Sequence, residues 1–152
     1  MSIDARLTEL GITLPDAPAP AANYVPYVQS GDLLFVSGQI AAGPDGLIRG
    51  RLGDGMDVAQ GAQAARACGL SLLAQARAAA GSLDRIARVV KLTGFVASTP
   101  DFTDQPEVVN GCSDLMVEVF GDKGRHARAA VSAAALPRGV AVEIEAIFQI
   151  ER

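Results

Sequence analysis

Strict alternation of apolar and polar positions marks the C-terminal end of the chain as a β-strand. One face of this strand is apolar along its whole length, with Val140, Val142, Ile144, Ala146, Phe148 and Ile150. The other face carries Glu143 and Glu145 together with Ile147. Two carboxylates on one strand face indicate either a solvated sheet surface or a polar pocket at a sheet edge or subunit seam.

A partner strand is expected immediately upstream, because residues 128–135 are small and β-branched. A Pro137-Arg138-Gly139 turn separates the two segments and predicts a closing hairpin. In a regular hairpin, Arg128 and Glu143 would stand about five residues apart along the ladder, on the order of 16 Å. A small ligand could then touch both residues only if two subunits contribute one each.

The remaining pattern predicts three further strand regions, two long helices and a short N-terminal helix. The expected elements are a helix at 3–10 capped by Ser2, strands at 24–29 and 33–37, a helix at 56–80, a strand-rich stretch at 86–98 and a helix at 103–120. Pro15, Pro18 and Pro20 enforce an extended arm after the first helix. Gly61 and Gly69 inside the long helix indicate close packing of that helix against the sheet.

This order is ββαβαββ, which predicts one α+β domain with two helices on one face of a mixed sheet. The other sheet face would still carry apolar or small residues, including Ala130, Ala134 and Ile147. A monomer would expose that face to water, so the sequence favours an oligomer.

Composition excludes several classes of protein. The 152 residues have a net charge of -4 and a pI near 4.9, which disfavours nucleic-acid binding. No apolar run is long enough for a membrane span, and Met1–Leu10 does not resemble an export signal, so a reduced cytoplasmic setting is expected. His126 is the single histidine, which excludes a multi-histidine metal site. Its charged surroundings suggest no partner for a Ser-His-Asp triad.

Several short motifs, in the same order along the chain, resemble the RidA/YjgF family of small imine and enamine deaminases. They are Pro26-Tyr27-Val28-Gln29, Val36-Ser37-Gly38-Gln39-Ile40, Val109-Asn110, Arg128, Leu136-Pro137 and Val142-Glu143-Ile144-Glu145. The resemblance covers residues 23–152. Residues 1–22 are similar to an N-terminal extension of one branch of the family and are expected either to cover the cleft or to brace the assembly.

The resemblance implies a chorismate-mutase-like α+β fold, a homotrimer and ligand clefts between subunits. It also implies hydrolysis of reactive 2-imino or 2-enamino acids to 2-keto acids and ammonia. No cofactor or metal is expected, because an imine carbon is already electrophilic. The expected partners are small 2-imino and 2-keto acids, with neither membrane nor nucleic acid.

Arg128 and Glu143 are the candidate catalytic residues. Arg128 falls on the family's substrate-carboxylate arginine, and its planar fork suits a carboxylate; a surface salt bridge is the alternative. Glu143 falls on the family's strand glutamate and could hold a water or pass a proton; a structural carboxylate at an interface is the alternative. Arg125 and Arg138 match no functional position and are expected to be solvated.

Five further residues are candidates for substrate binding. Tyr27 could form an aromatic wall of the cleft, or it could be a half-buried strand tyrosine. Ser37 and Gly38 end a strand, where a glycine lets the backbone approach a ligand. Asn110 could orient the arginine or the ligand, or could cap a helix. Ala130 stands where many relatives have Cys, so only a backbone contact remains possible there.

Two other functions fit the same scaffold. One is a trimer that binds small carboxylates or keto acids without turnover, because fold does not fix function. The other is an endoribonuclease, a label given to some relatives, which the acidic balance and the few aromatic residues disfavour. The pairing of Arg128 with Glu143 favours the deaminase.

Overall fold

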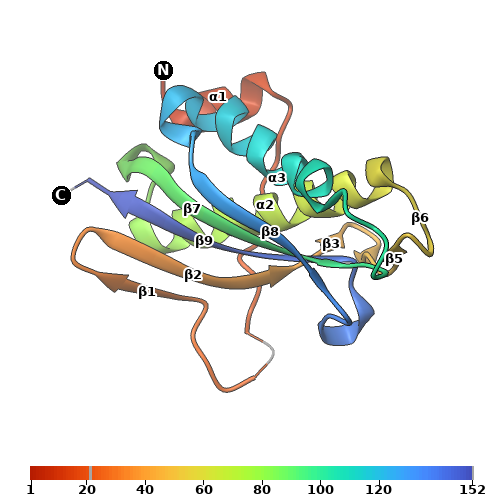
Figure 1. The fold of residues 1–152 in the computed structure, drawn as a ribbon. Helices are drawn as coiled ribbons and strands as arrows, with labels where there is room; N and C mark the ends of the chain where they lie inside the picture. The colour runs from red at the N-terminus through yellow and green to blue at the C-terminus, as the bar shows by residue number, and fades with distance from the viewer. Residues whose placement is uncertain (21, 152) are drawn as a thin grey trace.

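The computed structural model describes residues 1–20 and 22–151 (Figure 1). The helices are α1 (Ile3–Glu9), α2 (Val58–Ala80) and α3 (Gln105–Phe120), with short 3-10 turns η1 (Leu83–Arg85), η2 (Gly121–Gly124) and η3 (Pro137–Gly139). The long strands are β1 (Tyr27–Ser30), β2 (Leu33–Ile40), β7 (Ile86–Ala97), β8 (Ala127–Ala133) and β9 (Val142–Ile150). Four two-residue strands precede α2, namely β3 (Ala42–Gly43), β4 (Gly46–Leu47), β5 (Arg51–Leu52) and β6 (Gly55–Met56).

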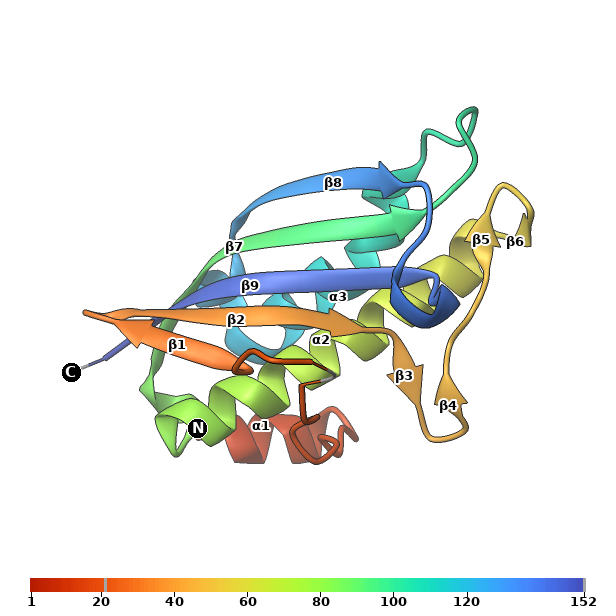
Figure 2. The same ribbon diagram turned by 90° about the horizontal axis from the view of Figure 1, so that it is seen from below.

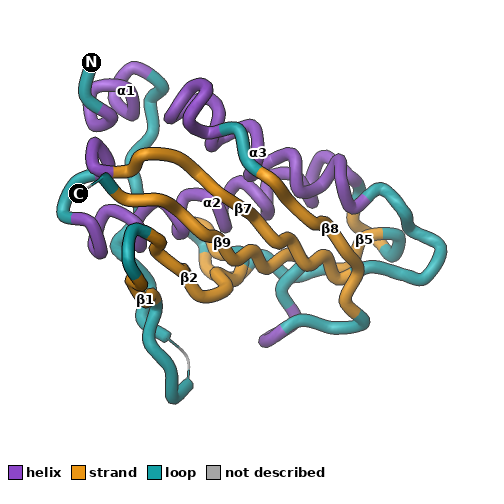
Figure 3. The backbone as a smooth tube through the Cα atoms, turned by 60° about the vertical axis from the view of Figure 1, so that its left-hand side comes forward, coloured by secondary structure: helices purple, strands orange, loops and turns teal. Residues whose placement is uncertain are grey.

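The five long strands form one mixed sheet in the order β1-β2-β9-β7-β8, which can be followed from below in Figure 2. All neighbours are antiparallel except β7 and β8, which are parallel. The helices α2 and α3 cover one face of this sheet, and the other face is open (Figure 3). The predicted α+β class, with two helices on one face of a mixed sheet, is confirmed.

The predicted closing hairpin is wrong, because β7 lies between β8 and β9. The strands β7 and β8 are joined through α3, which is the crossover that a parallel pair requires. The buried, apolar face of β9 fits the centre of the sheet, between β2 and β7. The short side chains of β8 bury little surface, and this strand lies at the edge.

Close packing of α2 is confirmed, but its partner differs from the prediction. A Cβ on Gly61 would meet Leu52 and Val108, and a Cβ on Gly69 would meet Leu115. The two glycines therefore let α2 approach α3 and the β5 segment, and not the sheet.

The N-terminal segment packs onto its own chain. The Ser2 hydroxyl accepts from the backbone N–H of Ala5 and caps α1, as the sequence predicts. The Arg6 Nε donates to the Glu118 carbonyl at the end of α3, at 2.9 Å. Further along, the Gln75 side chain of α2 donates to the Pro18 carbonyl at 2.6 Å. The arm that follows α1 is thereby held beside α2.

The open face of the sheet carries exposed apolar side chains beside Glu143 and Glu145, as predicted, although the apolar residues differ in part. Leu33, Phe35 and Val131 are 37%, 42% and 44% exposed, so a hydrophobic surface faces solvent. Ala130 is not part of this surface, because it pairs with Gly94 on the helix-covered side and packs against the core. Ala134 follows the end of β8 and also lies outside the open face.

Candidate functional site

A β-bulge in β2 creates the first part of the site. Val36 pairs with Ala146 and Gln39 pairs with Ile144, so Ser37 and Gly38 together oppose the single residue Glu145. A bulge of this kind redirects the side chains that follow it. After the bulge, the Gln39 side chain is buried and Ile40 pairs with Glu143.

The Glu143 carboxylate lies directly over Gly38. A Cβ added to Gly38 would stand 2.5 Å from the Glu143 Oε2, a distance that a side chain at this position could not keep. Glu143 is half-buried, and burial raises the pKa of its carboxyl above the usual range. The neighbouring Glu145 raises that pKa further by like-charge repulsion. Glu143 therefore belongs to a polar pocket wall at the bulge, whereas Glu145 is exposed.

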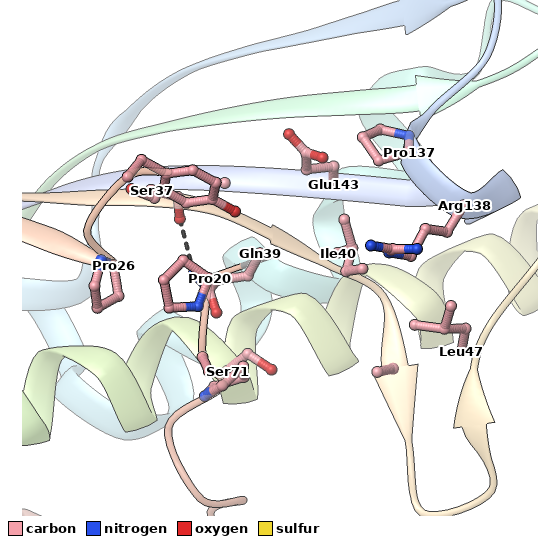
Figure 4. A pocket seen from close by; sticks show the side chains of 15 residues that line it. Pro20, Pro26, Ser37, Gln39, Ile40, Leu47, Ser71, Pro137, Arg138 and Glu143 are labelled. Carbon is pink, nitrogen blue, oxygen red and sulfur yellow. Dashed lines mark hydrogen bonds between the residues drawn. The ribbon is translucent and has the colours of Figure 1, made fainter. Parts of the chain in front are cut away.

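A cavity of about 620 Å³ opens beside Glu143. Its lining comes from the N-terminal arm, the β2 bulge, the β3–β4 hairpin, α2 and η3, as Figure 4 shows for Pro20, Pro26, Ser37, Gln39, Ile40, Leu47, Ser71, Pro137, Arg138 and Glu143. The strand β1 pairs with β2 only as far as Val36, so the arm flanks the rest of that edge. The Ser37 hydroxyl donates to the Val25 carbonyl at 2.7 Å and holds the arm there.

Arg138 is exposed, as expected, and among the described residues that line this cavity it is also the cation. Its φ of 58° lies in the left-handed region that non-glycine residues rarely adopt. The Arg49 Nε donates to the Arg138 carbonyl at 2.9 Å and stabilises this conformation. A backbone conformation of this kind depends on contacts with a distant segment, so local sequence reasoning does not reveal it.

Arg128 forms a second cluster, on the helix-covered side of β8. Its Nη1 donates to the Asn110 Oδ1 at 2.8 Å and to the Ser113 Oγ at 3.0 Å. Its Nη2 donates to the Pro106 carbonyl at 3.1 Å. Among the described residues, these three acceptors leave two of the five guanidinium donors without a bond, namely the Nε–H and one N–H of Nη2. Nε and Nη2 share one edge of the guanidinium, which suits a carboxylate.

His126 joins this second cluster, although its sequence context suggests no partner. Its Nε2 lies 2.9 Å from the Ser113 Oγ, and its Nδ1 lies 2.6 Å from the Gly124 carbonyl oxygen. Burial lowers the pKa of His126, the Gly124 carbonyl raises it, and the positive charge of Arg128 lowers it further. Ser113 follows Asn110 by three residues on α3, a spacing that points both to one side of the helix and could have revealed it.

The predicted residues therefore fall into two groups within one chain. Ser37, Gly38 and Glu143 meet at the cavity. Asn110 bonds to Arg128, and Ala130 follows Arg128 on the same side of β8. Tyr27 belongs to neither group, since it pairs with Val36 and packs against the core, whereas Tyr24 lines the cavity.

The described residues contain no group of three or more His, Cys, Asp and Glu side chains that could hold a metal ion. Cys68 and Cys112 are both free and buried. Burial raises the pKa of the Cys112 thiol to about 12, so the nucleophilic thiolate is disfavoured. None of the helices in the described part of the chain is long and apolar enough to cross a membrane.

Comparison with known proteins assigns the chain to a family. The family model for endoribonuclease L-PSP matches residues 14–150. Protein TCP17 of Trypanosoma cruzi is 52% identical over 150 residues, which cover 97% of this chain and 94% of that protein. The crystal structure of Atu1372 from Agrobacterium tumefaciens superposes with a TM-score of 0.90 at 49% identity, covering 99% and 94% of the two chains. The structure of E. coli TdcF with bound serine superposes with a TM-score of 0.65 at 28% identity, covering 90% of this chain and 94% of that chain.

Proposed function

Because the chain belongs to the endoribonuclease L-PSP family, which is the RidA/YjgF family that its motifs resemble, we propose that it hydrolyses reactive 2-imino and 2-enamino acids. Water adds to the C=N carbon, the C–N bond breaks, and the products are a 2-keto acid and ammonia. An enamino acid first takes a proton at carbon and becomes the imine. The protein needs to hold the carboxylate, place the water and move protons.

The observation that carries this proposal is the donor arrangement around Arg128. Three protein acceptors fix the guanidinium, and the Nε–H and one N–H of Nη2 stay available for a ligand. This pair matches the two oxygens of one carboxylate. The serine bound to TdcF is a small molecule with a 2-amino acid carboxylate, which supports a ligand of this class.

Glu143 supplies the acid–base chemistry in this proposal. Its raised pKa makes the carboxylate a better proton acceptor than a solvated glutamate. The carboxylate takes a proton from water as the water attacks the imine carbon, and the resulting acid then protonates the departing nitrogen. Gly38 has no side chain, which leaves room for this carboxylate and for the approach of a ligand to the backbone.

One active site is built from two copies of the chain in this proposal. Arg128 bonds to α3 on the helix-covered side of the sheet, whereas Glu143 lies at the cavity beside the β2 bulge. The apolar open face, with Phe35 and Val131 exposed, gives the copies a surface to bury. A homotrimer would then contain three sites, each with Arg128 from one subunit and Glu143 from its neighbour.

The cavity receives the substrate side chain. A volume of about 620 Å³ is far larger than a C4 imino acid needs, and its walls include the apolar side chains of Pro20, Leu47 and Pro137. Arg138 adds one positive charge to this wall. The preferred substrates are therefore imino acids with a bulky or acidic side chain.

The test is an assay of ammonia and keto acid release from amino acids that an oxidase converts to imines in situ. Wild-type protein should accelerate release, and Arg128→Ala should restore the uncatalysed rate. A wild-type protein that binds keto acids but accelerates nothing would indicate a binding protein on this scaffold. That alternative draws on Ala130, which places a methyl group where many relatives have a thiol.

A further inference from the structure

We propose that His126 and Ser113 are positioning residues that fix the guanidinium of Arg128 through a hydrogen-bond relay. The relay runs from the Gly124 carbonyl through His126 and Ser113 to the arginine. The inference rests on the proposed function, in which Arg128 holds the substrate carboxylate. It assigns a task to two side chains that the family motifs do not include.

The direction of each hydrogen bond in the relay follows from the chemistry of its atoms. The Gly124 carbonyl can only accept, so the His126 Nδ1, 2.6 Å away, carries a proton. In the neutral ring the Nε2 is then an acceptor, and the Ser113 hydroxyl donates to it across 2.9 Å. Because the Ser113 hydroxyl proton is donated to the histidine, the Ser113 Oγ accepts a hydrogen bond from the Arg128 Nη1 at 3.0 Å.

The neutral ring that this relay requires is favoured by its surroundings. Burial lowers the pKa of His126, the Gly124 carbonyl raises it, and the charge of Arg128 lowers it, so that the net shift is downward. The other charged groups of this region are engaged elsewhere: Arg125 pairs with Asp122, Lys123 lies 3.8 Å from Glu151, and Arg88 donates to the Arg125 carbonyl. Arg128 is accordingly the charged side chain that acts on the pKa of His126.

The relay orients the two unused donors of Arg128. A long arginine side chain has many rotamers, and a bidentate contact requires one of them. Asn110 and Ser113 occupy both N–H bonds of Nη1 and prevent rotation about the end of the side chain. Without the serine oxygen, the guanidinium keeps its charge but loses one of the three acceptors that hold its plane.

A nucleophilic role for the Ser113–His126 pair fits the structure less well. A serine nucleophile attacks with an oxygen lone pair, whereas here that oxygen accepts from the positively charged Arg128. This bond withdraws electron density from the hydroxyl oxygen in the resting state. The pair is therefore arranged to hold the arginine and not to form a covalent intermediate.

The first experiment measures binding of 2-oxobutanoate, a 2-keto acid product of the proposed reaction, by calorimetry. Arg128→Ala should weaken binding by about 100-fold, and Ser113→Ala and His126→Phe by about tenfold each, because an indirect anchor contributes less than a direct charged contact. Ser113→Thr keeps the hydroxyl and should bind nearly as the wild type does. In turnover, Ser113→Ala should raise KM and leave kcat almost unchanged, as expected for loss of uniform binding.

The outcomes separate this inference from the proposed function. If Arg128→Ala weakens binding but Ser113→Ala and His126→Phe do not, the relay is refuted. The binding of the substrate carboxylate by Arg128, called here the carboxylate clamp, then stands. If Arg128→Ala leaves binding unchanged, the clamp fails, and an NMR titration of His126 without ligand decides the relay. Arg128→Ala should raise the pKa of His126 because a neighbouring positive charge is lost; an unchanged pKa would overturn the relay. Covalent labelling of Ser113 by a fluorophosphonate would also overturn it.

Discussion

Arg128 and Glu143 lie on opposite faces of the same sheet. Arg128 pairs with Leu92 of β7, and Glu143 pairs with Phe95 of the same strand. An odd separation of three residues places the two side chains on opposite faces. The two positions are also about 10 Å apart along the strand and about 10 Å apart across two strand spacings. A small imino acid therefore cannot touch both residues of one chain, which is the basis for a site shared between copies.

The shared site predicts that two inactive variants restore activity together. Arg128→Ala and Glu143→Ala should each be nearly inactive alone. The two variants are unfolded and refolded together in equal amounts, so that about three quarters of the trimers contain both. Each mixed trimer has one complete site out of three, so about one quarter of wild-type activity should return. Light scattering and mass spectrometry verify the mixed trimers. Verified mixed trimers as inactive as their parents would place both residues in the same subunit's site.

The clamp predicts different results for two substitutions of Arg128. Arg128→Lys keeps the charge but cannot offer two parallel donors, so kcat/KM should fall by about 10- to 100-fold. Arg128→Ala removes both charge and donors and should lower kcat/KM by about 100-fold or more. Steady-state kinetics measures both, with circular dichroism to confirm folding. An Arg128→Ala protein that is folded and fully active would contradict the clamp.

If Glu143 is the proton acceptor, kcat/KM should depend on pH, and Glu145 should influence the pH at which kcat/KM falls. Because the ionised form of Glu143 accepts the proton, kcat/KM should fall as pH drops through its raised pKa. Glu145→Gln removes the like charge, lowers the pKa of Glu143 and should move this acid limb to lower pH. An acid limb in the same place in wild type and Glu145→Gln would show that Glu143 is not the group observed.

Glu143→Gln should lower kcat by about 100-fold without lowering stability. A carboxyl whose pKa is raised in the folded state contributes stability below its unfolded pKa, and that contribution is lost as pH rises through the folded pKa. The ionised glutamate therefore opposes folding at neutral pH, and the neutral amide does not. A thermal melt at pH 7 measures this, and a markedly lower Tm for Glu143→Gln would point to a structural role instead.

Gly38→Ala should reduce activity by displacing the Glu143 carboxylate. The new Cβ would stand 2.5 Å from the Oε2, so the flexible end of the glutamate must move. Gly43→Ala is the matched control, because its Cβ would meet only the Ile48 Cδ1 at 3.8 Å, an ordinary contact. Kinetic assays of both variants should show a loss of kcat for Gly38→Ala alone. Equal kinetics for the two would mean that the position of Glu143 is unimportant.

Arg138→Gly should change substrate preference while leaving the fold intact. Glycine adopts the φ of 58° without strain, so stability should stay the same or rise by up to about 1 kcal/mol. Loss of the cation from the cavity should weaken binding of 2-keto dicarboxylates more than binding of monocarboxylates of similar size. Calorimetry with a matched pair of ligands measures this difference. Equal losses for both ligands would remove Arg138 from side-chain selection.

The sequence by itself determined the helices, most of the long strands and the family, and it supplied the candidate site residues. Alternation from Val142 to Ile150 and the helical stripe of α2 are local signals, because side-chain period follows backbone geometry. The Ser2 cap of α1 is equally local. The motifs around Ser37, Glu143 and Arg128 identified the family, which the match over residues 14–150 confirms.

Only the tertiary structure decided which strands are neighbours and therefore where each charge lies. A local turn at Arg138 favours a hairpin, yet β9 pairs with β2 and β7, and β8 goes to the edge. That choice depends on burial summed over the whole sheet, which no short segment contains. It places Arg128 beside Ser113 and His126, brings Arg138 into the cavity and leaves Tyr27 against the core. These are contacts between residues distant in sequence, and only the packed fold brings them together.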